Sequence, residues 1–392
     1  MINFKQFTNL TDVVIPNAVQ LTNADFSSAF NNMQSLQYVS LPNRATNMYR
    51  VFNNCQNLIG ESPICSNQVT NMSNAYRYCS NLKGSPVCGE NVTNMSSTYN
   101  MCVNLTGSPV CGDNVTNMSG TYYYCQNLTG SPVCGNKVTN MSGAYFNCQN
   151  LTGSPVCGDN VTNMTGTYFN CRKLTGLPIC GDNVTDMSST YANCINLTGS
   201  PVCGENVTNM SHTYENCPNI IGPVVIGEKV TTMNSTFEGC TNLSGNVYIC
   251  SNSVDSMSRC FMGRNFQSAL NIYIPTTLFN TINSAAFSSA LTGYMITFAN
   301  QTEYNRYHNT QYNLDIYPVT NVKNAYIENE YGNNAIPFIK NQYIQNNQNI
   351  TAFKTEWHYA STELPIDSGS AFVMSVNMNE VGSVTVESME VK

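Results

Sequence analysis

Residues 115–137 read VTNMSGTYYYCQNLTGSPVCGNK, residues 138–160 read VTNMSGAYFNCQNLTGSPVCGDN, and residues 161–183 read VTNMTGTYFNCRKLTGLPICGDN. The leading position of this 23-residue period recurs, faithfully or loosely, at Ala45, Val69, Val92, Val115, Val138, Val161, Val184, Val207, Val230 and Val254. A repeat of this length is typical of a solenoid, because one unit is too small to bury its own apolar face and must stack on its neighbours. The sequence therefore predicts a solenoid of 23-residue coils over residues 45–275.

The apolar spacing inside one unit predicts which side chains point inward. Apolar residues follow Val138 at steps of three and four as far as Cys148, which favours one or two helical or 3₁₀ turns. The aromatic member of this series should form a buried column, which comprises Phe52, Tyr76, Tyr99, Tyr122, Tyr145, Tyr168, Tyr191, Tyr214, Phe237 and Phe261. Gly and Asn after Cys157 provide the return turn to the next unit.

The string VTNMSGxYxNCxNLTG resembles the BspA-like leucine-rich-repeat surface proteins, in particular the Mycoplasma-type repeats with a VTNM pattern. The resemblance implies a leucine-rich-repeat solenoid, a short strand at residues 151–156 in each coil, and a role in adhesion on a bacterial, protozoan or phage surface. The sequence departs from the family pattern in two ways: Ser-Pro-Val occupies the strand position, and a second cysteine follows it. Pro155 has no N–H for a strand ladder, so a broad, regular parallel sheet is doubtful.

The regular period covers only part of the chain. Residues 1–44 read as degenerate N-terminal capping repeats, and residues 276–312 resemble the tail that closes BspA-like arrays. Residues 313–392 contain no cysteine and predict a small, mainly β C-terminal domain. Its expected strands are residues 315–327, 335–344, 350–360, 370–378 and 382–391.

The eighteen cysteines fall mostly into two columns. The first comprises Cys79, Cys102, Cys125, Cys148, Cys171, Cys194, Cys217 and Cys240, and the second comprises Cys65, Cys88, Cys111, Cys134, Cys157, Cys180 and Cys203. Column neighbours should lie about 4.8 Å apart with parallel Cβ vectors, a poor geometry for a disulfide. We expect packed free thiols and a reducing or anaerobic setting. Disulfides near Cys55, Cys250 and Cys260, or metal binding, are the alternatives, but no CxxC pair exists and no metal site is predicted.

Two repeated polar features have a structural explanation that competes with a functional one. The turn carboxylates Glu90, Asp113, Asp159, Asp182, Glu205 and Glu228 predict a solvated acidic edge; glycosidase pairs and weak cation binding are the alternatives. The NVT, NMS and NLT triplets match glycosylation signals, but asparagines as close as Asn91 and Asn94 are expected to bond neighbouring turns instead.

Two positions before each first-column cysteine vary while the rest of the repeat is monotonous. Aromatic side chains cluster there in the middle coils, at Tyr123, Tyr124, Phe146 and Phe169. They predict an exposed stripe about 15 Å long that would suit sugar rings or an extended peptide, although neutral drift at a tolerant surface position is the alternative. Trp357 and Tyr359 in the C-terminal part are the second candidate binding residues.

Composition narrows the function. Only 10% of residues are charged and the net charge is -7, which argues against a nucleic-acid partner. The sequence has no run of 18 apolar residues, no secretory signal and no catalytic or cofactor-binding motif. We therefore expect no cofactor and no membrane insertion. The predicted function is a non-enzymatic adhesion or receptor-binding rod on a virion or cell surface, with a host-cell surface protein or glycan and other assembly proteins as partners. An intracellular protein-interaction scaffold in the cytoplasm is the alternative.

Overall fold

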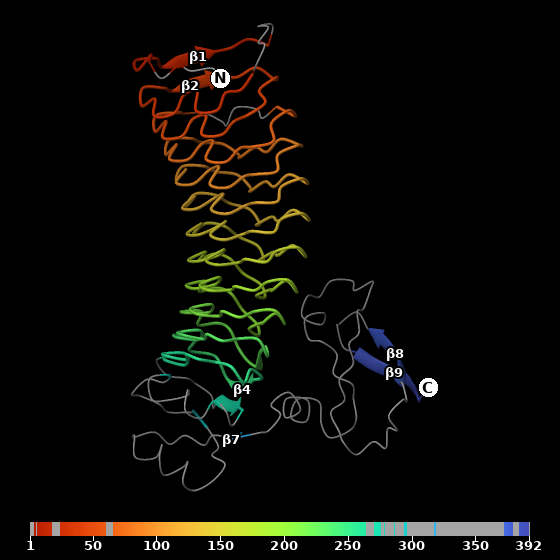
Figure 1. Cartoon of the computed structure of the whole chain (residues 1–392). Helices are drawn as coiled ribbons and strands as arrows, with labels where there is room; N and C mark the ends of the chain where they lie inside the picture. The colour runs from red at the N-terminus through yellow and green to blue at the C-terminus, as the bar shows by residue number, and fades with distance from the viewer. Residues whose placement is uncertain are drawn as a thin grey trace. The chain divides into compact units, whose positions relative to one another are not determined.

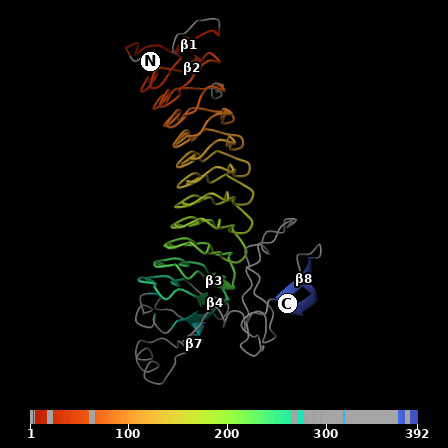
Figure 2. The same cartoon turned by 45° about the vertical axis from the view of Figure 1, so that its right-hand side comes forward.

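The computed structural model describes residues 4, 6–17, 24–59, 66–263, 270–275, 278, 286, 294–295, 317–318, 372–378 and 384–391. The chain divides into two compact units, Met1–Pro318 and Val319–Lys392, and each is described by itself. In the first unit, successive coils lie one above another from the N-terminal strands to β4 (Figures 1 and 2). Its N-terminal sheet and its C-terminal sheet lie at opposite ends of this stack.

Backbone hydrogen bonds join each coil to the next at every second residue. The N–H groups of Met118, Tyr122 and Tyr124 donate to carbonyl oxygens of the following coil at 2.7–2.9 Å. The N–H groups between them, as at Tyr123, donate instead to the carbonyl three residues back in the same coil. The predicted turns are therefore tight i to i−3 turns interrupted by left-handed residues such as Gly120, not continuous helix. In the described coils from Asn94 to Thr232, a single residue per coil, such as Asn117, forms a parallel bridge to both neighbours.

The core consists of columns of identical or similar side chains running through the stack. In the coil of Tyr145, the side chains of Val138, Met141, Cys148 and Leu151 are also fully buried. The aromatic column is buried throughout, as predicted, and its ring centroids lie 5.2–5.8 Å apart from Phe52 to Phe261. Each coil thus covers the apolar face of its neighbour, which a single coil could not do alone.

The strand predicted at residues 151–156 is wrong. In the described stretch 66–223 the structure has single bridges but no strand. In its place the Tyr168 hydroxyl accepts a hydrogen bond from the Val156 N–H at 3.0 Å and donates to the Val156 carbonyl at 2.6 Å. The same clamp joins Tyr99 to Val87, Tyr122 to Val110, Tyr145 to Val133, Tyr191 to Ile179 and Tyr214 to Val202. A buried hydroxyl therefore satisfies the backbone groups that a strand ladder would otherwise pair.

Among the described residues of the first unit, strands form only towards its two ends. They are β1 Asp12–Val14, β2 Tyr38–Ser40, β3 Val224–Ile226, β4 Gly245–Ile249, β5 Leu270–Ile274, β6 Tyr294–Met295 and β7 Tyr317–Pro318. All their pairings are parallel: β1 with β2, and β3-β4-β5-β6 in order with β7 also on β5. Where the regular coils have Pro201, β3 has Val224 and β4 has Val247. The backbone N–H that proline lacks is thereby restored.

The fourteen ladder cysteines that the structure describes are free thiols. First-column thiols are buried, and the Cys125 and Cys148 Sγ atoms donate to aromatic-column carbonyls of the preceding coil at 3.0 Å. Second-column thiols are half-buried. Burial raises the pKa of the Cys157 and Cys203 thiols to about 12. A thiol that stays protonated is a poor nucleophile, so these columns serve packing.

In the second unit the described residues form an antiparallel hairpin of β8 Phe372–Met378 and β9 Val384–Val391, with a bulge between Ser375 and Val376. These strands coincide with two of the five strands expected after residue 312. The second and third expected strands, residues 335–344 and 350–360, lie outside the described residues, as does most of the predicted cap at residues 276–312.

Candidate binding surface

The two variable positions form adjacent columns along the stack, here called the variable columns. The first comprises Asn31, Asn53, Arg77, Asn100, Tyr123, Phe146, Phe169, Ala192, Glu215 and Glu238. The second comprises Asn32, Asn54, Tyr78, Met101, Tyr124, Asn147, Asn170, Asn193, Asn216 and Gly239. Members of the first column come one residue after the buried aromatic residue of their coil, and members of the second column come two residues after it. The position of the core column therefore determines the positions of both surface columns.

The structure brings together the four predicted residues Tyr123, Tyr124, Phe146 and Phe169, here called the aromatic strip. The Tyr123 and Phe146 centroids lie 4.6 Å apart and those of Phe146 and Phe169 lie 4.3 Å apart, with planes within 18° of parallel. The Tyr124 ring lies 4.9 Å from that of Tyr123 and 5.7 Å from that of Phe146. Both faces of Phe146 are therefore covered by neighbouring rings, and its edge is what remains for solvent.

Two glycines of the following coils lie against rings of the strip. A Cβ on Gly143 would lie 3.5 Å from the Tyr123 ring, and one on Gly166 would lie 3.4 Å from the Phe146 ring. Both glycines have a positive φ near 60°. The equivalent residue beneath Phe169 is Ser189, which has the same left-handed backbone. The strip thus lies close against the backbone of the next coil, and its half-burial follows from this contact.

Backbone conformation adds residues to the site that the sequence reasoning missed. Every residue of the second variable column has φ between 55° and 75°. Most of them are Asn or Gly, the residues that adopt this left-handed region at least cost. Tyr78, Met101 and Tyr124 are the exceptions, in three consecutive coils. The run of Asn at the equivalent position of later coils was a sequence signal for this conformation.

Two arginines lie near the aromatic strip, one two coils before it and one in its last coil. The Arg77 guanidinium lies over the Tyr78 ring at 4.6 Å, and its Nη2 donates to the Tyr78 hydroxyl at 3.1 Å. The buried Nε of Arg77 has no hydrogen-bond partner. Four coils further along, the exposed Arg172 donates from Nε to Asn170 Oδ1 at 2.8 Å. Burial, together with Tyr124 and then Tyr78, raises the pKa of the Tyr123 phenol, so this ring stays uncharged at neutral pH.

Beyond the strip the columns become polar. Asn170 Nδ2 donates to Asn147 Oδ1, and Asn216 Nδ2 donates to Asn193 Oδ1 at 3.1 Å. Glu215, the first carboxylate in the columns after the strip, pairs with His212 at 2.9 Å. The C-terminal part of the columns is therefore internally satisfied, in contrast to the aromatic part.

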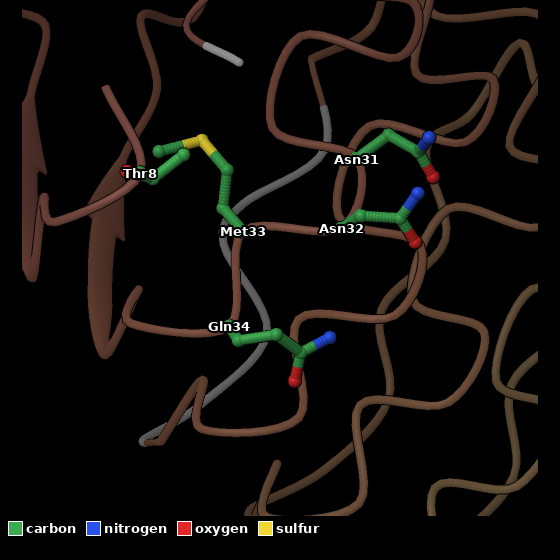
Figure 3. A pocket seen from close by; sticks show the side chains of 5 residues that line it. All are labelled: Thr8, Asn31, Asn32, Met33 and Gln34. Carbon is green, nitrogen blue, oxygen red and sulfur yellow. The ribbon is translucent and has the colours of Figure 1, made fainter. Parts of the chain in front are cut away.

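A hollow of about 400 Å³ lies at the N-terminal end of the same columns (Figure 3). It is lined by Thr8, Asn31, Asn32, Met33 and Gln34. The amides of Asn31 and Asn32 lie side by side and point the same way, while the Met33 side chain extends towards Thr8. Their Oδ1 atoms accept hydrogen bonds from the asparagines of the next coil at 2.7 and 3.0 Å. The hollow thus continues the surface that carries the strip.

The remaining candidates have structural places. The six turn carboxylates are all exposed, which fits a solvated acidic edge. The Asn91 side chain bonds the neighbouring turn as predicted, since its Nδ2 donates to the Asn67 carbonyl at 2.7 Å. The Asn94 side chain instead bonds its own turn, where Oδ1 accepts from the Ser96 N–H at 2.9 Å. Trp357 and Tyr359 lie outside the described residues.

In the part of the chain that the structure describes, no group of three or more His, Cys, Asp or Glu side chains is placed to hold a metal ion. That part also contains no helix whose length and apolar character would suit a membrane span.

Comparison with known proteins identifies the repeat. Residues 2–129 and 113–221 match the family described as BspA type leucine rich repeat region, and residues 185–291 and 209–336 match a Mycoplasma protein family of unknown function. None of the curated proteins compared with the chain matches it.

Two solved structures are similar to the chain. One is a leucine rich cell surface protein from Faecalibacterium prausnitzii A2-165, 16% identical over 76% of this chain and 90% of that one, with a TM-score of 0.41. The other is a leucine-rich repeat protein from Bacteroides ovatus ATCC 8483, 16% identical over 74% of this chain and 85% of that one, with a TM-score of 0.38.

Proposed function

The chain belongs to the BspA-type leucine-rich-repeat family, and from that premise we propose that it is a non-enzymatic adhesion or receptor-binding rod. It is displayed on a cell or virion surface as a stack of 23-residue coils, and its partner is a host-cell surface protein or glycan. The observation that carries the proposal is the aromatic strip, a group of half-buried rings in columns whose other members are mostly Asn. Contiguous exposed apolar groups with polar flanks mark interaction sites.

Neutral drift explains the strip less well than selection does. A tolerant surface position would gather residues that suit its backbone, and Asn does so in four consecutive later coils, at Asn147, Asn170, Asn193 and Asn216. Tyr124 keeps a ring where a left-handed backbone disfavours it. Strain of this kind concentrates at functional sites.

The test compares binding of two full-length variants to a panel of intact bacterial and animal cells by flow cytometry. The first changes Tyr123, Tyr124, Phe146 and Phe169 to Ser. The matched control changes Thr106, Thr129, Thr152 and Thr175 to Ser, four exposed positions in a different column. We expect the first to lose most binding and the second to keep it. Equal binding by both variants would remove the strip from the proposal.

The second compact unit is the other proposed place for recognition or for docking the rod into an assembly. Full-length chains with Trp357→Ser and Tyr359→Ser address this in the same assay. A loss of binding in these variants alone would assign recognition to the C-terminal unit.

A further inference from the structure

The geometry of the aromatic strip restricts the kind of ligand that it can bind. Sugar rings stack on aromatic faces, but the faces of Phe146 are occupied by Tyr123 on one side and Phe169 on the other. The exposed edges carry the positive part of the ring quadrupole, which favours carbonyl and carboxylate oxygens and the faces of other aromatic rings. Those groups occur together in peptides.

The charges around the strip favour an anionic ligand. Arg77 belongs to the first variable column two coils before Tyr123, and Arg172 lies beside the second column in the coil of Phe169, where it bonds Asn170. The variable columns contain no carboxylate from Asn31 as far as Asn193. The Arg77 guanidinium is already held by Tyr78, which reduces the entropy lost when it binds a carboxylate.

The spacing of the two arginines sets the length of the ligand. Buried rings of successive coils between Tyr76 and Tyr168 lie 5.2–5.7 Å apart. Four coil steps therefore place the coils of Arg77 and Arg172 roughly 22 Å apart along the stack. An extended chain advances about 3.3 Å per residue, so roughly seven residues span this distance.

We propose that the variable columns between Arg77 and Arg172 bind an extended peptide segment whose two ends are acidic and whose middle is apolar or aromatic. Its carboxylates pair with the two guanidinium groups, and its apolar side chains contact Met101 and the ring edges of the strip. The inference rests on the proposed binding function and names the class of partner.

The probe is a fluorescein-labelled heptapeptide, Asp-Phe-Leu-Phe-Leu-Phe-Asp, and binding to the full chain is followed by fluorescence anisotropy. A second heptapeptide has Lys at both ends, a third has Ser at the five middle positions, and maltohexaose serves as a competing sugar. The acidic apolar peptide should bind about ten-fold more tightly than either altered peptide, because each of them loses charge-assisted or apolar contacts. Equal affinity for the Asp and Lys peptides, or competition by maltohexaose, would overturn the proposal.

Charge reversal provides the sharper test. The double variant Arg77→Glu, Arg172→Glu should prefer the Lys peptide over the Asp peptide. The matched control Arg50→Glu, Lys83→Glu makes the same change of net charge at two residues that are not part of the proposed site, and it should keep the original preference. If both double variants keep it, the assigned ends of the site are wrong.

Tyr124→Asn separates binding from folding. Asn occupies the equivalent left-handed position in Asn147 and Asn170, so the variant should fold at least as well as the parent chain while it binds the Asp peptide about five-fold more weakly. Unchanged affinity in the folded variant would contradict the proposal. The variant with Tyr123, Tyr124, Phe146 and Phe169 changed to Ser distinguishes the two proposals. If it loses cell binding but the parent chain does not bind the Asp peptide, the proposed adhesion function stands and only the inference about the peptide fails.

Discussion

In the regular coils a tyrosine hydroxyl forms hydrogen bonds with the backbone of the segment that follows the repeated leucine. In the coils at either end, a neighbouring strand forms the hydrogen bonds of this segment instead. The Tyr122 hydroxyl bonds both the N–H and the carbonyl of Val110. The aromatic residue that follows β3 by the same interval is Phe237, and there Val225 pairs with Tyr248 of β4. At the other end Phe52 follows β2, which pairs with β1.

Two residue changes therefore occur together. The regular coils combine Pro with Tyr, and the end coils combine a residue that has an N–H with Phe. Proline removes a ladder donor, so the remaining polar groups of its segment need a side-chain partner, and the tyrosine hydroxyl provides one that is both donor and acceptor. The comparison shows that strand content in this stack depends on a pair of positions twelve to thirteen residues apart, not on the leucine spacing.

The largest expected difference between the regular coils and the end coils is the loss of folding stability at alkaline pH. A regular coil buries two cysteine thiols and a tyrosine, and burial raises the pKa of Cys157 and Cys203 to about 12 and that of the Tyr122 phenol above its ordinary range. A raised folded-state pKa gives stability that is present below the unfolded value of 9.0 for a thiol and is lost as pH rises towards 12. Each such thiol removes about 1.4 kcal/mol per pH unit in that window.

We therefore expect the regular coils to unfold cooperatively not far above about pH 9, because many such thiols act together. Circular dichroism and tyrosinate absorbance during a pH titration measure this, and both signals should change together. A variant with Cys125→Ala, Cys148→Ala and Cys171→Ala should show a shallower loss of stability with pH. Ordinary tyrosine titration in a chain that stays folded would contradict the expectation.

The comparison also shows what the sequence could and could not predict. The 23-residue period and its apolar steps correctly predicted the buried column of Tyr145 and the packing of Cys148, because a fixed period places equal side chains at equal positions. The strand at residues 151–156 was wrong, although Pro155 had already made a ladder doubtful. The missing step was to treat the hydroxyl of the tyrosine, and not only its ring, as part of the structure. The exchange of Tyr for Phe at both ends was the available signal.

At the candidate site, the clustering of Tyr123 and Phe146 followed from the period, since neighbouring coils repeat each position at one height. Ring orientation did not follow, because spacing places a Cα and leaves the side-chain torsions open. The stacked rings expose their edges to solvent, whereas the prediction that sugar rings could stack here required exposed ring faces. The left-handed backbone of Tyr124 was equally hidden until its asparagine counterparts were compared.

Val247→Pro places proline in strand β4, and Pro109→Val places a residue with an N–H in a regular coil, so each variant gives one kind of coil the residue of the other kind. β4 lies between β3 and β5, so proline there removes a ladder donor from a central strand and should cost about 3 kcal/mol or more. Pro109→Val restores an N–H that the clamp of Val110 by Tyr122 does not need, and should cost under about 1 kcal/mol, mainly through the unfolded state. Chemical denaturation measures both, and equal costs would remove the distinction between the coils.

Tyr122→Phe removes one clamp. The Val110 N–H and carbonyl would both lose their partner, and each unsatisfied buried group costs about 1–3 kcal/mol, so the variant should lose about 2–6 kcal/mol. Phe237→Tyr is the matched control, because the backbone next to it already pairs in the β3–β4 ladder and offers the new hydroxyl no vacant groups. A cost of Tyr122→Phe under about 1 kcal/mol, equal to an ordinary solvent-exposed hydrogen bond, would mean that water satisfies Val110 and that the clamp does not replace a strand.

Tyr248→Phe should have the smallest effect, although Tyr248 is as fully buried as Tyr122. Tyr248 lies within β4, where the strand ladder and not its own hydroxyl satisfies the backbone. Its hydroxyl accepts a hydrogen bond from Asn246 Nδ2 at 2.8 Å, and its ring stacks on that of Tyr273 at 4.7 Å, a contact that phenylalanine keeps. We expect a loss of about 1 kcal/mol, the usual net contribution of one hydrogen bond. Thermal and chemical denaturation of Tyr122→Phe and Tyr248→Phe side by side would decide the matter, because a loss as large at Tyr248 as at Tyr122 would show that burial of the hydroxyl, and not its backbone partners, sets the cost.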